Sequence, residues 1–216
     1  MIINKDYLLD IIKGRRSERT MRPEPIAAED LDAVVEAALW APSGSNQQPW
    51  HFAVVTNREL IIKMAAAVEA KITDIKSRIN SSSAQKAFNG YLQYLNFFIN
   101  SSALICCFAE PYRALLERLL SRYAPEISVS TRETASVQSV AAAIQNMLLT
   151  AHVLGLAACW TTGPLIAQAE IEAFVKPSGG DWSLLAVVAL GAREPGKGQP
   201  KALQRRPRNE TVSYYE

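Results

Sequence analysis

Three arginines and a serine follow directly on a predicted helix end near the N-terminus. Apolar residues recur at helical spacing through residues 4–13, and Gly14 is typical of the position that ends a helix. The next five residues are Arg15, Arg16, Ser17, Glu18 and Arg19. Arginine binds phosphate through paired N–H groups, and a neighbouring hydroxyl adds a donor. This spacing predicts a phosphate-binding loop, although a solvated charge cluster would have the same composition.

A second polar segment, residues 41–52, reads Ala-Pro-Ser-Gly-Ser-Asn-Gln-Gln-Pro-Trp-His-Phe. It joins an apolar helical pattern to a β-branched strand, and such connections usually have about 4 to 6 residues. Its hydroxyls, amides and free N–H groups offer many hydrogen-bond donors and acceptors. Functional residues gather on loops of this kind. The alternative is a turn-rich helix end followed by a tight corner.

Other common catalytic signatures are missing from the sequence. It has no Gly-x-Gly-x-x-Gly and no P-loop pattern. It also has no Gly-x-Ser-x-Gly elbow, and two histidines leave no plausible Ser-His-Asp set. Cys106, Cys107 and Cys159 lie in apolar strands, so a metal site with His51 or His152 is not expected. We interpret His152 as a satisfied core histidine.

The composition is that of an ordinary globular protein. The chain has 216 residues, of which 49% are hydrophobic and 20% charged, with a net charge of +2. This charge gives no reason to expect nucleic acid as a partner. No apolar run is long enough to span a bilayer, and the N-terminus lacks a signal-peptide pattern. Three cysteines without a Cys-x-x-Cys pair favour reduced thiols and a cytoplasmic location.

Hydrophobic periodicity predicts alternating helices and strands. Helices are predicted over 4–13, 28–40, 59–79, 91–99, 111–122, 134–156 and 165–175, and strands over 51–56, 103–108, 157–160 and 183–191. Helix 134–156 is apolar on nearly all sides, which indicates a place in the core or in a subunit interface. The same interpretation applies to the aromatic stripe of Tyr91, Tyr94, Phe97 and Phe98. Residues 80–90 read as a polar link, and residues 192–216 as a tail without a core of its own.

Four separated motifs together resemble the nitroreductase family of flavoenzymes over nearly the whole chain. They are, in family order, Arg15-Arg16-Ser17, the loop from Pro42-Ser43-Gly44 to Pro49-Trp50, the turn Thr161-Thr162-Gly163-Pro164, and Leu203-Gln204-Arg205-Arg206-Pro207. The resemblance implies an α+β fold with a central mixed β-sheet flanked by helices, and a single domain over residues 1–216. It further implies an intertwined homodimer, with the tail 192–216 wrapping the partner and an FMN at each of two interfacial sites.

The resemblance also assigns residues to the FMN. Arg15 and Ser17 would contact the phosphate and ribityl chain together with Arg205, while Arg206 is a second choice for the phosphate. Arg16 would lie beside the ring, and Arg19 near flavin N1 and O2, where a cation favours the reduced flavin. Thr162 and Gly163 would pack near N5, and Thr161 is also assigned to cofactor binding. The other chain would supply Pro42, Ser43, Gly44 and Asn46.

The activity implied is a ping-pong reaction in which NADH or NADPH reduces the flavin and leaves before a small acceptor is reduced. No side chain has to act as a nucleophile or general base. Nitroaromatics and quinones are the expected acceptors, and segments 71–90 and 123–132 are expected to cover the site. The alternatives are a non-catalytic flavin-binding or storage protein, a deiodinase- or enone-reductase-like branch, and an interaction protein whose arginine tail meets an acidic partner.

Overall fold

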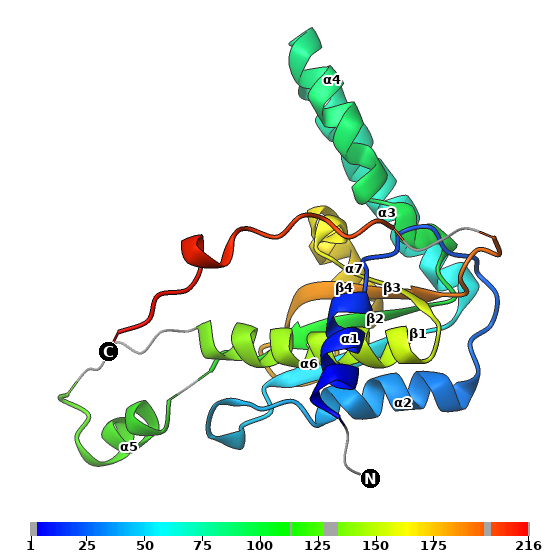
Figure 1. Cartoon of the computed structure of the whole chain (residues 1–216). Coiled ribbons are helices and arrows are strands. Elements are labelled where there is room, and N and C mark those ends of the chain that lie inside the picture. The colour runs from blue at the N-terminus through cyan, green and yellow to red at the C-terminus, as the bar shows by residue number, and fades with distance from the viewer. Residues whose placement is uncertain (1–3, 113, 128–133, 197–199, 216) are drawn as a thin grey trace.

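The computed structural model describes residues 4–112, 114–127, 134–196 and 200–215. Its centre is a four-stranded sheet in the order β1-β2-β4-β3 (Figure 1). The strands are β1 (Trp50–Val55), β2 (Ala103–Ala109), β3 (Ala157–Thr161) and β4 (Ser183–Gly191). All seven residues of β2 are buried because this strand lies inside the sheet and helices cover both faces. The four strands predicted from periodicity are therefore present, each within two residues of its predicted ends.

Alternate residues of the strands feed two hydrophobic cores, one on each face of the sheet. In β2, Leu104, Cys106 and Phe108 join the core that contains α3 (Arg58–Arg78) and α7 (Gln168–Val175). The residues between them belong to the core that contains α2 (Ala28–Leu39) and α6 (Thr134–Val153). This period of two is the normal consequence of strand geometry.

The three strand pairings are all antiparallel, where we expected a mixed sheet. The reason lies in the connections between neighbouring strands. After β1 the chain leaves along α3 and returns along α4 (Ser82–Tyr91), so it enters β2 at the end of the sheet where β1 finished. The short excursion through η4 (Gly163–Ala167) and α7 likewise returns the chain to the end of β3, and Thr161 lies opposite Val187.

The predicted polar link 80–90 is wrong, because these residues are mostly helical. Ser81 caps α4, its side chain accepting a hydrogen bond from the N–H of Ala84, and Gly90 lies inside the helix. Figure 1 shows that α4 and the end of α3 stand away from the rest of the molecule. Segment 71–90 is therefore largely helical and not a loop, and its expected role in covering the site stays a prediction.

Other helix boundaries differ by a few residues. The N-terminal helix α1 is Lys5–Gly14, and the predicted helix at 111–122 begins later, as α5 (Leu115–Tyr123). The aromatic segment 91–99 forms two 3-10 turns, η2 (Leu92–Tyr94) and η3 (Phe97–Asn100). Half of the predicted covering segment 123–132, residues 128–132, lies outside the described residues.

Helix α6 buries one face in the chain itself, and leaves Val137 and Val153 about half exposed. Its Asn146 donates a hydrogen bond from Nδ2 to the carbonyl oxygen of Ala37 (2.9 Å), which satisfies a partly buried amide. In the described part of the tail the turn η5 (Arg208–Glu210) is the one helical segment, and the tail runs away from the sheet (Figure 1). Within the described residues, no helix combines the length and apolarity that a membrane span needs.

Candidate functional site

The Arg16 guanidinium lies against main-chain carbonyls at the end of α1. Its Nη1 donates to the carbonyl oxygens of Lys13 (2.5 Å), Gly14 (3.1 Å) and Arg15 (2.9 Å). Its Nε donates to the carbonyl oxygen of Pro200 in the tail (3.2 Å). The last carbonyls of a helix lack partners within the helix, so Arg16 satisfies them and joins the tail to α1.

Glu18 is anchored to the sheet by both its main chain and its side chain. Its N–H donates to the carbonyl oxygen of Ala158 in β3 (2.9 Å). Its buried carboxylate accepts from Arg193, whose Nε lies 3.1 and 3.2 Å from the two carboxylate oxygens and whose Nη2 lies 2.9 Å from Oε1. The flanking Ser17 and Arg19 are exposed.

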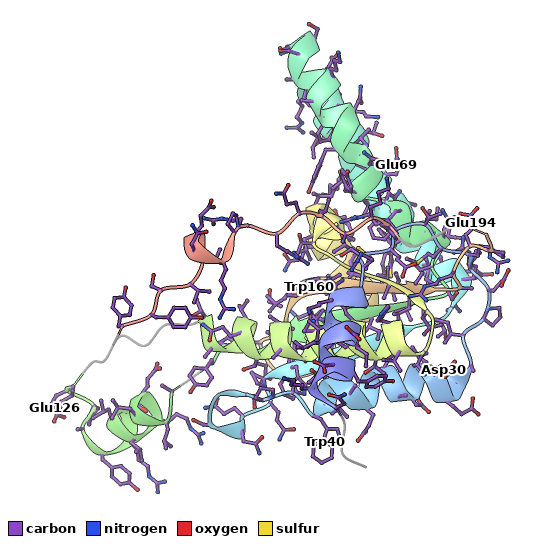
Figure 2. All side chains as sticks on the ribbon, in the orientation of Figure 1. Asp30, Trp40, Glu69, Glu126, Trp160 and Glu194 are labelled. Atoms are coloured by element: carbon purple, nitrogen blue, oxygen red, sulfur yellow. The ribbon has the colours of Figure 1, made fainter. Side chains whose placement is uncertain are left out.

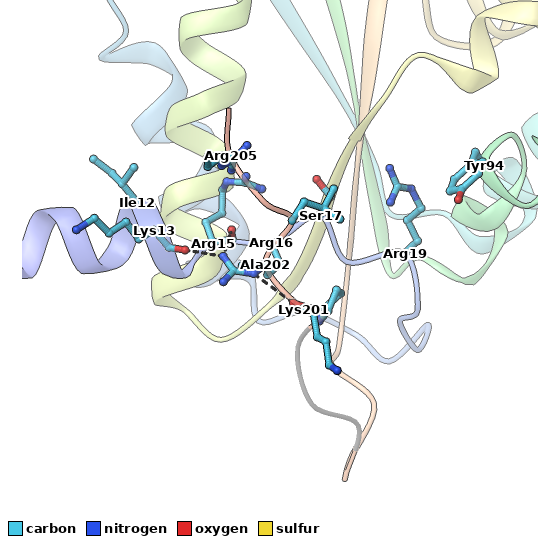
Figure 3. Close-up of a pocket in the computed structure, with 12 residues that line it drawn as sticks. Ile12, Lys13, Arg15, Arg16, Ser17, Arg19, Tyr94, Lys201, Ala202 and Arg205 are labelled. Carbon is cyan, nitrogen blue, oxygen red and sulfur yellow. Dashed lines mark hydrogen bonds between the residues drawn. The ribbon is translucent and has the colours of Figure 1, made fainter. Parts of the chain in front are cut away.

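A cavity of about 680 Å³ lies between residues 15–19, which we call the cation loop, and the tail (Figure 3). It is lined by Ile12, Lys13, Arg15, Arg16, Ser17, Arg19, Tyr94, Pro200, Lys201, Ala202, Leu203 and Arg205. Half of these residues are Lys or Arg, and among the described residues no carboxylate lines the cavity. The fold thus brings together both segments that the sequence assigned to the phosphate.

The structure distinguishes between the two adjacent tail arginines. Arg205 lines the cavity. Arg206 does not, and its Nε instead lies 3.7 Å from Glu210 Oε2 in an exposed ion pair four residues along the chain. Arg205, the first choice for the phosphate contact, is therefore the one of the two that lines the cavity, and the contact itself stays a prediction.

Arg19 is held against aromatic rings at the far side of the cavity. Its guanidinium carbon lies 5.0 Å from the centre of the Tyr94 ring and 6.0 Å from that of Phe97, within the range of cation–π attraction. Figure 3 shows Arg19 and Tyr94 side by side, apart from Arg15. Tyr94 is therefore part of the site, although the aromatic stripe to which it belongs predicted only a position in the core or in a subunit interface.

The turn 161–163 packs directly behind Tyr94. The Gly163 N–H donates to Thr161 Oγ1 (3.2 Å). A Cβ at Gly163 would lie 2.8 Å from the Tyr94 carbonyl oxygen, so only glycine permits this approach. Thr161, Thr162 and Gly163 do not line the cavity themselves.

The loop containing Pro42, Ser43, Gly44 and Asn46 lies outside this cavity. Asn46 lines a separate cavity of about 380 Å³ with Glu36, Leu39, Trp40, Ala41 and Gln48. Exposed Trp40 stands at the end of α2, where its Nε1 donates to Glu36 Oε1 at 2.7 Å (Figure 2).

The backbone of that loop is unusual. Ser45, Asn46 and Gln48 have φ near +50°, which is uncommon for residues other than glycine and clusters at functional sites. The Ser43 hydroxyl accepts a hydrogen bond from the Gln48 N–H (3.0 Å), which holds this conformation. The assignment of these residues to the flavin of a second chain stays a prediction.

His152 lies behind the cation loop. It is only partly buried, whereas we expected a core residue. Its Nδ1 lies 3.4 Å from Arg193 Nη2. Burial and the charge of Arg193 lower the pKa of His152, and Arg15 and Arg16 lower it further, while Glu18 raises it.

The three cysteines are buried and free, as expected. Burial raises the pKa of Cys106 to about 12 and that of Cys107 well above its ordinary value. Within the described ranges, no group of three His, Cys, Asp or Glu residues could hold a metal ion.

Sequence reasoning missed Glu18, Arg193, Tyr94, Lys13 and Lys201 as members or supports of the site. Glu18 stood in the motif itself, where its single negative charge among three arginines was the available signal. The others carry no signal in the sequence, because only the fold brings them to the cavity.

Comparison with known proteins supports this description of the fold. The model of the nitroreductase family matches residues 12–192. A protein of Archaeoglobus fulgidus, provisionally named an NADH dehydrogenase/NAD(P)H nitroreductase, is 31% identical over 152 residues, covering 70% of this chain and 65% of the relative. The chain thus spans just under two thirds of that relative's length.

Two solved structures confirm the α+β fold. A BluB-like flavoprotein from Clostridium difficile 630 has a TM-score of 0.80 at 29% identity, covering 97% of this chain and 99% of that one. A nitroreductase with bound FMN from Desulfitobacterium hafniense has a TM-score of 0.69 at 23% identity, covering 96% and 97%.

Proposed function

The chain belongs to the nitroreductase family, and from this premise we propose that it is an FMN-dependent oxidoreductase. It uses NADH or NADPH to reduce small electron-poor acceptors such as nitroaromatics and quinones. The name of the Archaeoglobus relative supports the nicotinamide donor, and the FMN in the Desulfitobacterium nitroreductase supports the cofactor. The three free cysteines support a cytoplasmic location.

The observation that carries this proposal is the cation-lined cavity. Arg15 and Arg205 reach it from opposite ends of the chain, and Ser17 also lines it. Among the described residues, no carboxylate forms an ion pair with either arginine, so both charges are available to an anion. Such a donor set fits the phosphate dianion of FMN.

Bound FMN would supply the transfer of two electrons from the nicotinamide to the acceptor. The chain's own residues bind and orient it: Arg15, Ser17 and Arg205 at the phosphate, and Arg19 at the other end of the cavity. Arg19 rests on Tyr94, which fixes a positive charge where it would tune the electronics of the ring. The chain needs no acid, base or nucleophile for this chemistry.

We further propose that residues 1–216 form one domain and that the active form is a homodimer. Both hydrophobic cores pack on the same sheet, which supports a single domain. The loop from Pro42 to Asn46 does not line its own chain's cavity, which supports its use in the site of a second copy. In the tail, Leu203, Tyr214 and Tyr215 are 84%, 70% and 95% exposed, as expected of a segment that wraps a partner.

The first experiment is the visible absorption spectrum of the purified protein, repeated after anaerobic addition of NADH or NADPH. Flavin bands that bleach are the expected result. Bands that persist with both nicotinamides would favour a non-catalytic flavin-binding protein. A chain that takes up no FMN would refute the proposal.

A matched pair of variants tests the site itself. Arg205→Ala removes a charged contact to the phosphate, worth roughly 1.5 to 3 kcal/mol, and should weaken FMN binding about ten- to a hundredfold. Arg206→Ala removes an adjacent arginine of the same charge that pairs with Glu210, and should leave the affinity nearly unchanged. Fluorescence titration with FMN measures both, and equal losses would contradict this assignment.

A further inference from the structure

We propose that the buried ion pair between Glu18 and Arg193 positions the cation loop 15–19, and through it sets the affinity of the cavity for the phosphate of FMN. This inference rests on the proposed function, and it assigns a role to two residues that touch neither the cavity nor the flavin. Neither Glu18 nor Arg193 is among the residues that line the cavity.

The geometry of Glu18 fixes the direction of its neighbours. Its N–H is bonded to Ala158 of β3, and its carboxylate is bonded to Arg193, two residues after the end of β4. Successive side chains of an extended chain point to opposite sides. Because the main chain and the side chain of Glu18 are both anchored on the side of the sheet, the side chains of Ser17 and Arg19 point outward to the cavity.

Arg193 is itself held in place. Its Nε and Nη2 both donate to the carboxylate of Glu18, which is the planar two-point contact that arginine makes best. The same Nη2 lies 3.4 Å from His152 Nδ1 on α6. The loop is thereby joined to β3, β4 and α6 at one point, whereas Arg16 joins it to the tail.

An electrostatic role and a positioning role for Glu18 predict opposite changes in FMN affinity. A carboxylate beside a phosphate site repels the phosphate, so removing the charge of Glu18 should strengthen FMN binding if electrostatics were its only influence. If Glu18 instead holds Ser17 and Arg19 in place, the same change should weaken FMN binding. The sign of the change therefore distinguishes the two roles.

The test compares FMN and riboflavin, which differ only in the phosphate. Dissociation constants are measured by fluorescence titration of the full chain freed of flavin, for wild type, Glu18→Gln and the double variant Glu18→Gln/Arg193→Met. Glu24→Gln is the matched control, since Glu24 forms a largely exposed ion pair with Arg22 and neither residue lines the cavity. The double variant leaves no unpaired buried charge, so it carries the test if the single variant does not fold.

We expect FMN binding to weaken about tenfold or more in both Glu18 variants, because Ser17 and the neighbouring Arg15, the contacts of this loop to the phosphate, are misplaced. Riboflavin binding should weaken severalfold less, because only Arg19 of this loop lies toward the ring, and Glu24→Gln should match wild type for both flavins. The single variant Arg193→Lys keeps Glu18 and the positive charge of its partner, so it should retain part of the FMN affinity that the double variant loses.

Three results would overturn the inference: tighter FMN binding in Glu18→Gln, unchanged FMN binding in the double variant, or equal losses for FMN and riboflavin. The last would indicate general damage to the fold. In each case a wild-type chain that binds FMN leaves the proposed function standing. A wild-type chain that binds neither flavin would refute the proposed function, and this inference with it.

Discussion

Replacing Arg16 by alanine should destabilise the chain and loosen its tail, although the neighbouring Arg15 faces the cavity. Arg16 donates four hydrogen bonds to main-chain carbonyls, three at the end of α1 and one to Pro200. In Arg16→Ala these carbonyls lose a charged donor and the tail loses its bond to α1. Arg15→Ala removes no such contact, so it should lower FMN affinity with little effect on stability.

The size of the Arg16 effect follows from these contacts and their exposure. A hydrogen bond to a charged group contributes about 1.5 to 3 kcal/mol when buried. The Arg16 side chain is only partly buried and three of its bonds are local, so water replaces much of what is lost. We expect a loss of about 1 to 2 kcal/mol in the free energy of unfolding. For a chain of this length that lowers Tm by about 2 to 8 °C.

Thermal unfolding followed by circular dichroism measures the first effect, and the rate at which thermolysin cuts before Leu203 measures the second. Arg78→Ala is the matched control, because Arg78 makes an exposed ion pair with Asp74 on α3 (2.9 Å) that is worth about 0.5 kcal/mol or less. An Arg16→Ala chain with the Tm and cleavage rate of wild type would refute the structural role of this arginine.

Three further predictions concern other parts of the fold. Gly163→Ala places a Cβ 2.8 Å from the Tyr94 carbonyl oxygen, and should cost about 1 to 3 kcal/mol of stability in urea unfolding; an unchanged midpoint would contradict this close packing. The pKa of His152 is lower in the folded chain than the ordinary 6.5, so the unfolded chain binds the proton more readily. Stability should be full above pH 6.5 and fall as the pH drops through 6.5 toward the folded pKa, with a smaller slope in His152→Gln; equal slopes would contradict it. Burial and the raised pKa of Cys106 and Cys107 should prevent their alkylation by iodoacetamide at pH 8 in the native state, and rapid labelling measured by mass spectrometry would contradict it.

Much of the architecture could be predicted from local pattern. The four strands and the long helices were found from hydrophobic periodicity, because burial of one face of a helix or strand leaves a period that the sequence displays. The helix α4 was missed because the sequence 82–91 is polar and contains Gly90, both of which resemble a link. Its cap at Ser81 and its pairing with α3 as a hairpin outweigh those local signals.

The direction of the strands was not predictable in the same way. Antiparallel pairing of β1 with β2 depends on α3 and α4 going out and back, which follows from the turn at residues 79–81. The hydrophobic pattern predicts that a helix or strand is present, but not the end of the sheet at which the chain enters the next strand.

For the site, the sequence by itself determined the residue types: a cluster of arginines with a serine after a helix end, and a second pair of arginines in the tail. It also determined that chemistry requiring an acid, base or metal has few residues to use. Only the tertiary structure decided which arginine does what. Arg15, Arg16 and Arg205 all line the cavity, but Arg16 donates its hydrogen bonds to main-chain carbonyls, and Arg206 pairs with Glu210 outside the cavity.

The physical reason is that the direction of a side chain in an extended segment is set by what anchors its backbone. Here the anchor is Glu18, whose partner Arg193 lies 175 residues away in the chain. Adjacent arginines of identical chemistry therefore acquire different roles from a contact that no local spacing can display.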